Sequence, residues 1–470
     1  MNMPLWTAKD AAAAAQARTE QEWNATGISI DSRTVGKGDL FIALVGDNFD
    51  GHDFVNAAFA AGAVAAIISR PIDNPAGPLL FVKNTSEALY DLARFARARS
   101  NAKIAAITGS VGKTGTKEML RLALSDQGPT HASHGNLNNH FGLPLSLARL
   151  PASARFAVLE MGMNHAGEIE PLTRLARPHV AVVTAIEMVH AEFFASEAAI
   201  AEAKGEIFLG LEKGGVAIIN RDTPHFSRLA ELARGQGASV ASFGSHIEAD
   251  ARLLDCAVDP ATTHVLSLIH DHPLAYRLSV SGRQWAMNSL AVLAAVEALG
   301  GNVETAAKSL IAITPPKGRG QQLVVNIQGG NFELIDESYN ASPASMKAAI
   351  ASLRAAKPAK GGRRIAILGD MLELGTRSEE LHASLASSLI EFGIDLVLTA
   401  GTRMEKLHHV LPSAMRGPHA PDAENIIPLA RQAIRPGDVA MVKGSAGSKM
   451  SRVVSALAEA LPPQKTAVNG

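Results

Sequence analysis

Cysteine is almost absent from this chain of 470 residues, which contains Cys256 alone. A single cysteine excludes an internal disulfide, and with it the disulfide-stabilised scaffolds of small secreted proteins. A lone thiol most often behaves as a small buried hydrophobic side chain. The cysteine content therefore fits a reducing compartment.

An excess of charge of either sign is also missing. The 44 Lys and Arg residues balance 45 Asp and Glu residues, for a formal net charge of -1. No global attraction to nucleic acid or to an anionic membrane is expected, so any anion must be bound locally. The first 15 residues lack the leucine-rich stretch of a secretory signal, and no segment approaches the apolar length of a membrane span. We expect a cytoplasmic protein without a nucleic-acid partner and without membrane insertion.

The length and the breaks along the chain predict several domains. With 47% hydrophobic and 19% charged residues the composition is that of a globular protein, and at roughly 100–200 residues per domain the length predicts about three domains. The sequence changes character near Asn101, and the segment TPPKGRG at 314–320 interrupts a helical stretch. We therefore predict domains at residues 1–100, 101–314 and 315–470.

The order of apolar runs predicts an α/β fold in all three domains. Residues 1–100 combine short β-like runs around Gly36 and Gly38 with helical stretches. In the central domain, apolar runs at 103–108, 156–159, 180–185 and 216–220 alternate with helices, which predicts a parallel sheet covered by helices. Runs at 364–368, 396–400 and 439–442 predict a smaller Rossmann-like sheet in the C-terminal domain.

A glycine-rich turn lies between the first central strand and a helix predicted from Thr116. Its backbone N–H groups and the helix N-terminus would face an anion, which makes the central domain a P-loop ATPase domain. Lys113 would reach the outer phosphates, and the Thr114 hydroxyl would hold magnesium. The strict P-loop pattern needs glycine at position 107, where this chain has Ile107. The prediction therefore depends on the short form GSVGKT, and the alternative is a glycine turn that arose by chance and binds no phosphate. The predicted ATP-binding residues of this loop are Gly109, Ser110, Val111, Gly112, Lys113, Thr114 and Gly115.

Three further side chains lie after the central strands. Glu160 ends the apolar strand RFAVLE, at the edge where ligands collect in parallel sheets, and a carboxylate there suits magnesium. His190 follows the run at 180–185, and Lys204 lies in the next helical stretch. Taken singly, His190 fits an interior histidine equally well, and Lys204 fits a solvated helix residue better.

The ordered motifs of this chain resemble those of the Mur ligase family over most of its length. They are TGSVGKTGTKE, GNLNNHFGLPLSL, the Glu160 strand end, His190 before AEFFASEAAIAEAKGEIF, IDESYNASPASM and ILGDMLELG. The resemblance implies that Lys204 is carbamylated, which turns a cation into a carboxylate-like anion that can ligate or orient magnesium. It also implies that Thr114 holds one magnesium ion and that Glu160 and His190 bind a second. Lys113, Lys204 and His190 are the catalytic residues that it implies.

Nucleotide and substrate contacts follow from the same resemblance. Asn288 matches the residue that reads the adenine edge, and Arg319 and Asp336 match residues that hold phosphate and ribose, so ATP would lie between two domains that close around it. The uridine diphosphate end of the substrate is assigned to the first domain, with Arg33 as phosphate partner. If the resemblance to the family is set aside, the segment ESYNASP fits an ordinary transition from a loop to a helix. The implied substrate-binding residues are Ser32, Arg33, Asp50, Gly51, His52, Asn138, Asn139, Tyr339, Asn340 and Lys443.

The function that the resemblance implies is ATP-dependent joining of a carboxylate to an amine through an acyl phosphate. The LGDMLELG and IDESYNASP segments, and the lack of an Asp-Asn-Pro-Arg motif, resemble the member that adds D-alanyl-D-alanine to UDP-N-acetylmuramoyl-tripeptide. ATP, two magnesium ions and these small-molecule substrates are its implied partners, and we expect a monomer. The alternatives are the family member that adds the third amino acid and, from another class, a nucleotide-binding regulator that hydrolyses ATP slowly.

Overall fold

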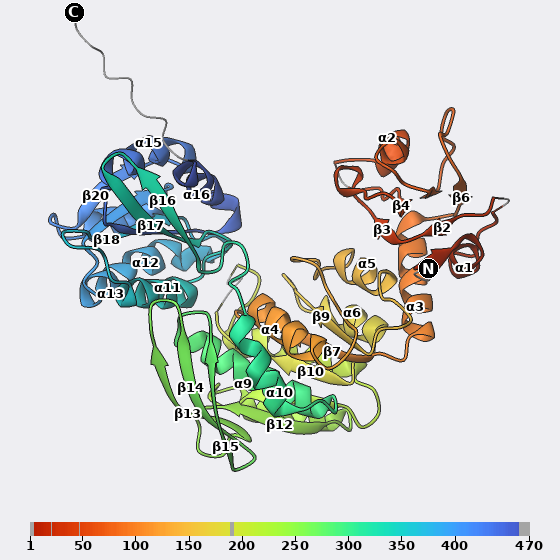
Figure 1. Ribbon diagram of the computed structural model, residues 1–470, viewed down its shortest axis with the longest axis horizontal. Coiled ribbons are helices and arrows are strands. Elements are labelled where there is room, and N and C mark those ends of the chain that lie inside the picture. The colour runs from red at the N-terminus through yellow and green to blue at the C-terminus, as the bar shows by residue number, and fades with distance from the viewer. Residues whose placement is uncertain (1–3, 20, 47, 189–191, 460–470) are drawn as a thin grey trace, which may run out of the picture.

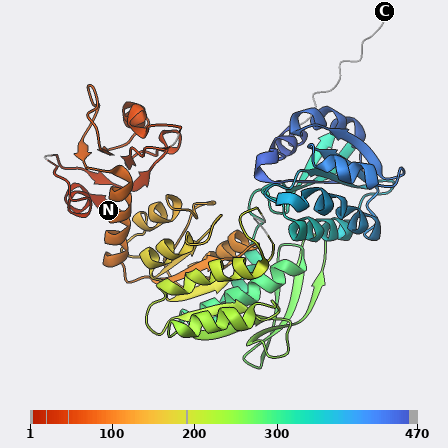
Figure 2. The same cartoon turned by 180° about the vertical axis from the view of Figure 1, so that it is seen from behind.

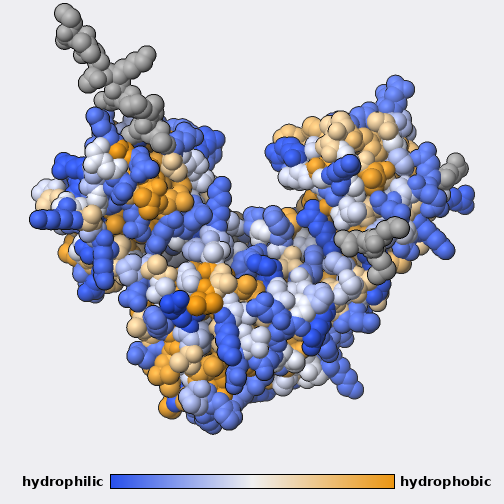
Figure 3. Space-filling view, in the orientation of Figure 1, coloured by the Kyte–Doolittle hydropathy of each residue, from blue (hydrophilic) through white to orange (hydrophobic). Residues whose placement is uncertain are grey.

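The computed structural model describes residues 4–19, 21–46, 48–188 and 192–459. Three lobes follow one another along the chain: a first lobe and a C-terminal lobe stand apart on either side of a central lobe (Figures 1 and 2). The space-filling view shows an open hollow between the two outer lobes, with the central lobe as its floor (Figure 3). The predicted boundaries near 100 and 314 fall in connections between elements, and the exact borders stay predictions.

The first lobe is built on a parallel sheet of four strands in the order β3-β4-β5-β6. Helix α3 (Thr85–Arg99) covers this sheet and also packs against α5 (Gly142–Ala148) of the central lobe. Asn84 caps α3 by accepting hydrogen bonds from the N–H groups of Ser86 and Glu87. The strands are β3 (Gly27–Ser29), β4 (Asp39–Ile42), β5 (Ala65–Ile68) and β6 (Leu79–Phe81).

The central lobe contains a nine-stranded sheet in the order β15-β14-β13-β12-β11-β10-β7-β9-β8. The predicted apolar runs form parallel strands β7 (Lys103–Thr108), β9 (Phe156–Glu160), β10 (Val180–Val183) and β11 (Val216–Asn220). Their side chains alternate between two apolar cores. Ile107, for example, faces α4 (Lys113–Ser125) and α9 (Arg283–Ala298), while its neighbour Ala106 faces α5, α6 (Ile169–Ala176) and α8 (Phe226–Gly235). The parallel, helix-covered sheet is therefore present as predicted.

One edge of the central sheet departs from that prediction because it is antiparallel. Strand β13 (Ala251–Val258) pairs with β14 (Thr263–Ile269), and β14 pairs with β15 (His272–Leu278). His270 and Asp271 join the last two strands, and both have positive φ, as a two-residue hairpin turn requires. Alternate residues of β14 are buried, so this extension covers α9 with one face only. Strands β8 (Thr130–Ala132) and β12 (Ser239–Gly244) complete the sheet.

The C-terminal lobe has a six-stranded sheet in the order β16-β17-β21-β18-β19-β20. The predicted runs form β18 (Arg364–Gly369), β19 (Leu396–Ala400) and β21 (Val439–Lys443), which are parallel to one another and to β17 (Gly330–Glu337). Strand β16 (Gln321–Ile327) is antiparallel to β17 and was not among the predicted strands. Helix α11 (Pro343–Ala355) covers one face, and α15 (Ala423–Ala433) and α16 (Ser451–Ala458) cover the other. Strand β20 spans Arg416–Ala420.

In the part of the chain that the structure describes, no helix is both long enough and apolar enough to cross a membrane.

Candidate nucleotide and metal site

The turn between β7 and α4 is shaped by two glycines. Gly109 and Gly112 have φ values of +148° and +87°, which side-chain-bearing residues rarely adopt. A Cβ on Gly109 would lie 1.9 Å from Thr184 Oγ1, and one on Gly112 would lie 2.8 Å from Asn288 Nδ2. Helix α4 begins at Lys113, three residues earlier than predicted, so its N-terminal N–H groups open directly onto this turn.

Lys113 lies at the start of α4 and bends back over the turn. Its Nζ donates a hydrogen bond to the Gly109 carbonyl at 2.8 Å. Burial lowers the pKa of Lys113; the nearby Glu160 carboxylate acts against this shift, and the Arg319 guanidinium adds to it. A bound phosphate would supply the negative charge that these cations lack.

Thr114 Oγ1 and Glu160 Oε2 are among the buried oxygens near the turn that have no hydrogen-bond partner among the described residues. The other oxygen of Glu160, Oε1, accepts a hydrogen bond from Asn138 Nδ2 at 2.8 Å. A buried oxygen left unpaired costs about 1–3 kcal/mol, and hard oxygen donors are the ligands that magnesium prefers. Each of the two oxygens is therefore a suitable magnesium ligand. Among the described residues, no group of three His, Cys, Asp or Glu side chains is arranged to hold a metal, and His190 lies outside them.

Lys204 is buried at the end of α7 (Glu197–Gly205), with 2% of its surface exposed, so the solvated-residue interpretation is wrong. Burial, reinforced by the charge of Lys113 and opposed by Glu206, lowers the pKa of Lys204 well below its usual value. A lowered pKa favours the neutral amine. The neutral amine is also the form that reacts with carbon dioxide.

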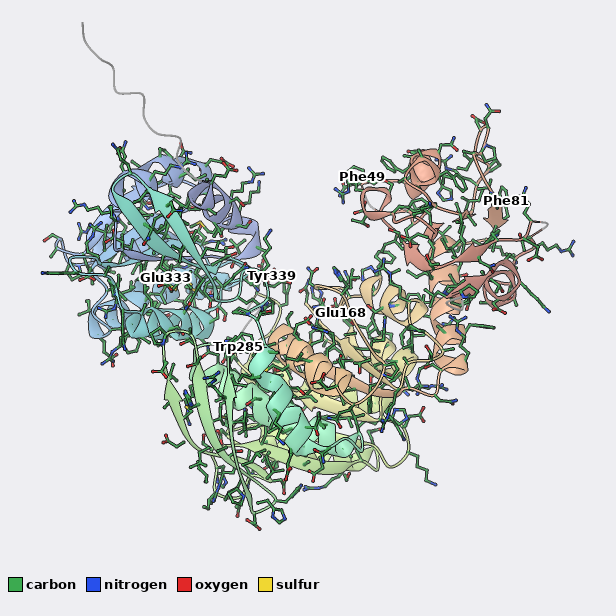
Figure 4. All side chains as sticks on the ribbon, in the orientation of Figure 1. Phe49, Phe81, Glu168, Trp285, Glu333 and Tyr339 are labelled. Carbon is green, nitrogen blue, oxygen red and sulfur yellow. The ribbon has the colours of Figure 1, made fainter. Side chains whose placement is uncertain are left out.

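A cavity of about 630 Å³ brings most of the predicted site residues together at the junction of the central and C-terminal lobes. Figure 4 marks this junction with Trp285, from the first turn of α9, and Tyr339, from the loop after β17. The predicted residues that line the cavity are Ser110, Val111, Gly112, Lys113, Gly115, Asn138, Glu160, Asn288, Arg319, Tyr339, Asn340 and Lys443.

On the C-terminal side, Lys443 and Asp336 are held by neighbouring loops. Lys443 is 3% exposed, and its Nζ donates to the Asn340 carbonyl at 2.9 Å and lies 3.4 Å from Glu337 Oε2. Burial lowers the pKa of Lys443, although Glu337 acts against the shift. Asp336 Oδ1 accepts hydrogen bonds from the N–H and the hydroxyl of Ser338, and Asp336 does not line the cavity. Its predicted contact with ribose stays a prediction.

The residues predicted to bind the uridine end lie apart from this cavity, in the first lobe. His52 is 3% exposed, with Nδ1 2.5 Å from Asp50 Oδ1 and with Nε2 accepting the Ser69 N–H. Burial opposes ionisation of Asp50, but hydrogen bonds from His52 and Arg70 outweigh it and lower the pKa of Asp50 to about 2. Arg33, the predicted phosphate partner, is exposed and pairs with the neighbouring Asp31. The predicted contacts of Ser32, Arg33, Asp50, Gly51 and His52 stay untested.

Glu187 and Trp285 line the cavity and were not among the predicted site residues. Glu187 follows β10, and its backbone N–H and carbonyl both bond to the Ser110 hydroxyl. Burial, helped by the charge of Glu197, raises the pKa of Glu187 to about 7. A carboxylate after an apolar parallel strand is the signal that identified Glu160, so the same reasoning could have found Glu187. Trp285 lies against Gly115, where an added Cβ would be 2.9 Å from its ring, and its sequence context carries no such signal.

Comparison with known proteins places these lobes in a family. The family models "Mur ligase family, catalytic domain", "Mur ligase middle domain" and "Mur ligase, glutamate ligase domain" match residues 24–97, 107–296 and 318–446. The chain belongs to the Mur ligase family. Among the curated relatives of this Mur ligase are UDP-N-acetylmuramoyl-tripeptide--D-alanyl-D-alanine ligases. The Rickettsia prowazekii relative is 35% identical and covers 96% of this chain and 99% of its own length. The Escherichia coli relative is 36% identical and covers 92% and 93%.

Solved structures agree with this placement. MurF from Acinetobacter baumannii superposes on this Mur ligase with a TM-score of 0.83 at 31% identity, covering 97% of this chain and 99% of its own. MurF ligase from Thermotoga maritima in complex with ADP gives a TM-score of 0.76 at 28% identity, covering 92% and 97%. The expected α/β fold with three lobes is therefore confirmed.

Proposed function

We propose that this Mur ligase joins a carboxylate of UDP-N-acetylmuramoyl-tripeptide to the amine of D-alanyl-D-alanine in an ATP-dependent reaction of peptidoglycan precursor synthesis. The observation that carries the proposal is the match, over 92% or more of the chain, to relatives that bear this activity in their names. The cavity supports the ATP-dependent part, because the glycine-rich turn and Glu160, whose Oε2 is unpaired, line the same junction.

ATP would lie with its phosphates on the turn before α4 and its base toward α9. The N-terminal N–H groups of α4 and Lys113 would hold the phosphates, and Asn288, next to Gly112, would contact the adenine edge. Arg319 would reach the phosphates from the C-terminal side of the cavity. The T. maritima neighbour, which was solved in complex with ADP, supports nucleotide binding by this fold.

One magnesium ion would be held by Thr114 Oγ1 and a second by Glu160 Oε2, with Asn138 fixing the orientation of Glu160. When bound, two magnesium ions would offset the negative charge of the triphosphate and the substrate carboxylate as these approach. We assign His190 to the second ion, together with Lys204 as a carbamate. The neutral amine that burial favours would attack carbon dioxide, forming an N–C bond as one C=O π bond opens and a proton leaves, and so change from a neutral group to an anion.

The chemistry proceeds in two displacements. An oxygen of the substrate carboxylate attacks the γ-phosphorus of ATP, the bond to the ADP oxygen breaks, and an acyl phosphate forms. The free amine then attacks the acyl carbon, and phosphate leaves from the tetrahedral intermediate. Lys113 stabilises the charge of the transferred phosphoryl group. The first lobe would hold the UDP end of the substrate through Arg33, and its approach to the C-terminal lobe would close the hollow of Figure 3.

Phosphate release measured with each substrate omitted in turn tests the proposal. Release that requires both the UDP-linked tripeptide and D-alanyl-D-alanine, with a product of the summed mass less water, is the expected result. Release with ATP alone, unchanged by either substrate, would instead identify a nucleotide-binding regulator. Activity with a UDP-linked dipeptide and a free diamino acid would identify the ligase of the third residue.

The ATP and UDP-linked substrates support action in the cytoplasm, and we propose that the protein acts there as a monomer. Light scattering coupled to size exclusion tests the second point against the 49.2 kDa mass of one chain. A mass of two chains at working concentration would contradict it.

A further inference from the structure

The guanidinium of Arg319 lies on the ring of Tyr339, with its Cζ 4.0 Å from the ring centroid. Arg319 belongs to the segment that links the central lobe to the C-terminal lobe, and Tyr339 follows β17, so the contact joins two separate stretches of chain. Both side chains line the cavity. Figure 4 places Tyr339 at the edge of the C-terminal lobe that faces the central lobe.

The backbone on each side of Arg319 is already fixed. The Tyr339 N–H donates to the Gly318 carbonyl at 3.1 Å, and the Gly320 N–H donates to the Asp336 carbonyl at 2.8 Å. Gly318 has φ of +76°, and a Cβ there would lie 2.9 Å from Tyr339 N. These bonds set where the Arg319 side chain starts, so only the direction of that long side chain remains to be determined.

Cations and carboxylates both lie around the guanidinium, and Glu160 and Glu337 line the cavity with it. The charge of Arg319 contributes to the lowered pKa values of both Lys113 and Lys443, so it lies near one lysine of the phosphate turn and one of the C-terminal lobe. Among the described residues, no hydrogen bond or ion pair from the guanidinium accompanies the stacking on Tyr339. In the described part of the chain, the ring face of Tyr339 is thus the group that contacts the guanidinium while no nucleotide is bound.

We infer that Tyr339 is a positioning residue that acts through Arg319, holding the guanidinium toward the phosphate turn so that it is in place when nucleotide arrives. The inference rests on the proposed binding of ATP at this junction. It differs from the assignment of Tyr339 to the peptide substrate, because the ring face, and not the hydroxyl, carries the role. Prepositioning reduces the ordering cost of binding, which for a cation–π contact corresponds to about a 2- to 30-fold change in affinity.

Binding of a nonhydrolysable ATP analogue with magnesium, measured by calorimetry, tests this role without any ligase turnover. Tyr339→Phe keeps the ring and should bind like the unmodified protein. Tyr339→Leu should raise the Kd of the analogue by about 2- to 30-fold. Phe392→Leu is the matched control, since Arg354 Cζ lies 5.5 Å from the centroid of the Phe392 ring in the same lobe, and Phe392 does not line the cavity. This variant should leave the Kd of the analogue unchanged.

The double variant separates positioning from direct contact. Once Arg319→Ala has removed the guanidinium, adding Tyr339→Leu should cause no further loss of analogue affinity. Thermal unfolding of each variant identifies any that fail to fold, and Tyr339→Trp then provides a second ring-bearing variant that should retain affinity.

Three results would overturn the inference. The first is that the losses of analogue affinity in Arg319→Ala and Tyr339→Leu add in full in the double variant. The others are a loss of affinity in Tyr339→Phe equal to that in Tyr339→Leu, or an effect of Tyr339→Leu confined to the KM of the UDP-linked tripeptide. Absence of ligase product from the unmodified protein would count against the proposed function instead, because the analogue titrations do not depend on turnover.

Discussion

Asn138 donates a hydrogen bond from Nδ2 to Glu160 Oε1 at 2.8 Å, and this contact determines which carboxylate oxygen remains unpaired. The adjacent Asn139 does something different, because its Oδ1 accepts the N–H groups of Phe141 and Gly142 at the start of α5. Two neighbouring asparagines thus separate into one that orients a carboxylate and one that holds the turn before α5.

The first prediction compares these two asparagines. Asn138→Ala should raise the magnesium concentration for half-maximal product formation by about 10- to 100-fold, the usual loss when a ligand's supporting hydrogen bond is removed. Asn139→Ala should lower stability by about 1 kcal/mol through loss of its hydrogen bonds to the turn before α5, without changing the magnesium dependence. Initial rates across a magnesium series measure the first effect, and thermal unfolding measures the second. Equal magnesium shifts in the two variants would contradict the proposed role of Asn138.

The second prediction concerns Lys204, which is 2% exposed and has a lowered pKa. Buffers freed of carbon dioxide should reduce activity, and bicarbonate should restore it, because the neutral amine binds carbon dioxide reversibly. Lys204→Ala should abolish activity, and formate or acetate should recover part of it by supplying the missing carboxylate. Carbon-13 NMR with labelled bicarbonate should show one carbamate signal that Lys204→Ala lacks. No loss of activity in Lys204→Ala, or a loss without rescue and without that signal, would exclude the carbamate.

The sequence predicts strands well where both faces of a sheet are covered. Strands β7, β9, β10 and β11 are continuous apolar runs because helices pack on both sides. Strands β13, β14 and β15 were missed because half of their side chains face outward, so Arg277 and Leu278 of β15 alternate exposed and buried and leave no apolar run. Strand β16, at the edge of its sheet, was missed for the same reason.

The site was predictable in residue type but not in orientation. Glu160 and Lys113 follow from their places at strand and helix ends, which topology fixes. Asp336 lies at such a place as well, yet Ser338, two residues further on, takes up its Oδ1. Tyr339 was assigned to substrate, whereas its stacking partner Arg319 lies 20 residues earlier in the chain. Contacts of this kind depend on side-chain directions that motif order does not encode.

The third prediction is a pH effect at Glu187, where burial and Glu197 raise the pKa to about 7. Its ordinary value is 4.5, so between these two values the folded protein holds a proton that the unfolded chain has lost. Stability should therefore fall as pH rises through this window, and the folded carboxyl is fully ionised above it. Glu187→Gln cannot ionise and should be more stable than the unmodified protein at pH 8, by on the order of 1–3 kcal/mol.

Thermal unfolding at pH 5 and pH 8, without nucleotide or magnesium, measures this effect. The decline from pH 5 to pH 8 should be smaller in Glu187→Gln than in the unmodified protein. Glu168→Gln is a suitable control, because hydrogen bonds from Asn164 and His165 outweigh burial and lower the pKa of that carboxyl. Glu168→Gln should leave the fall in stability between pH 5 and pH 8 unchanged. If both variants reduced this fall equally, the assignment to Glu187 would be contradicted.

The fourth prediction uses two glycines with the same backbone strain but different neighbours. Gly112 and Gly214 have φ of +87° and +76°, so replacing either with alanine should cost about 1–2 kcal/mol of stability from the left-handed conformation alone. Around Gly214 an added Cβ meets nothing within 4 Å, whereas at Gly112 it would lie 2.8 Å from Asn288 Nδ2. Gly112→Ala should therefore push Asn288 away from the phosphate turn and weaken binding of an ATP analogue by about 10-fold or more, as loss of a hydrogen bond of about 1.5 kcal/mol would. Gly214→Ala should bind the analogue normally, and equal affinities for the two variants would mean that Asn288 does not contact the nucleotide from this position.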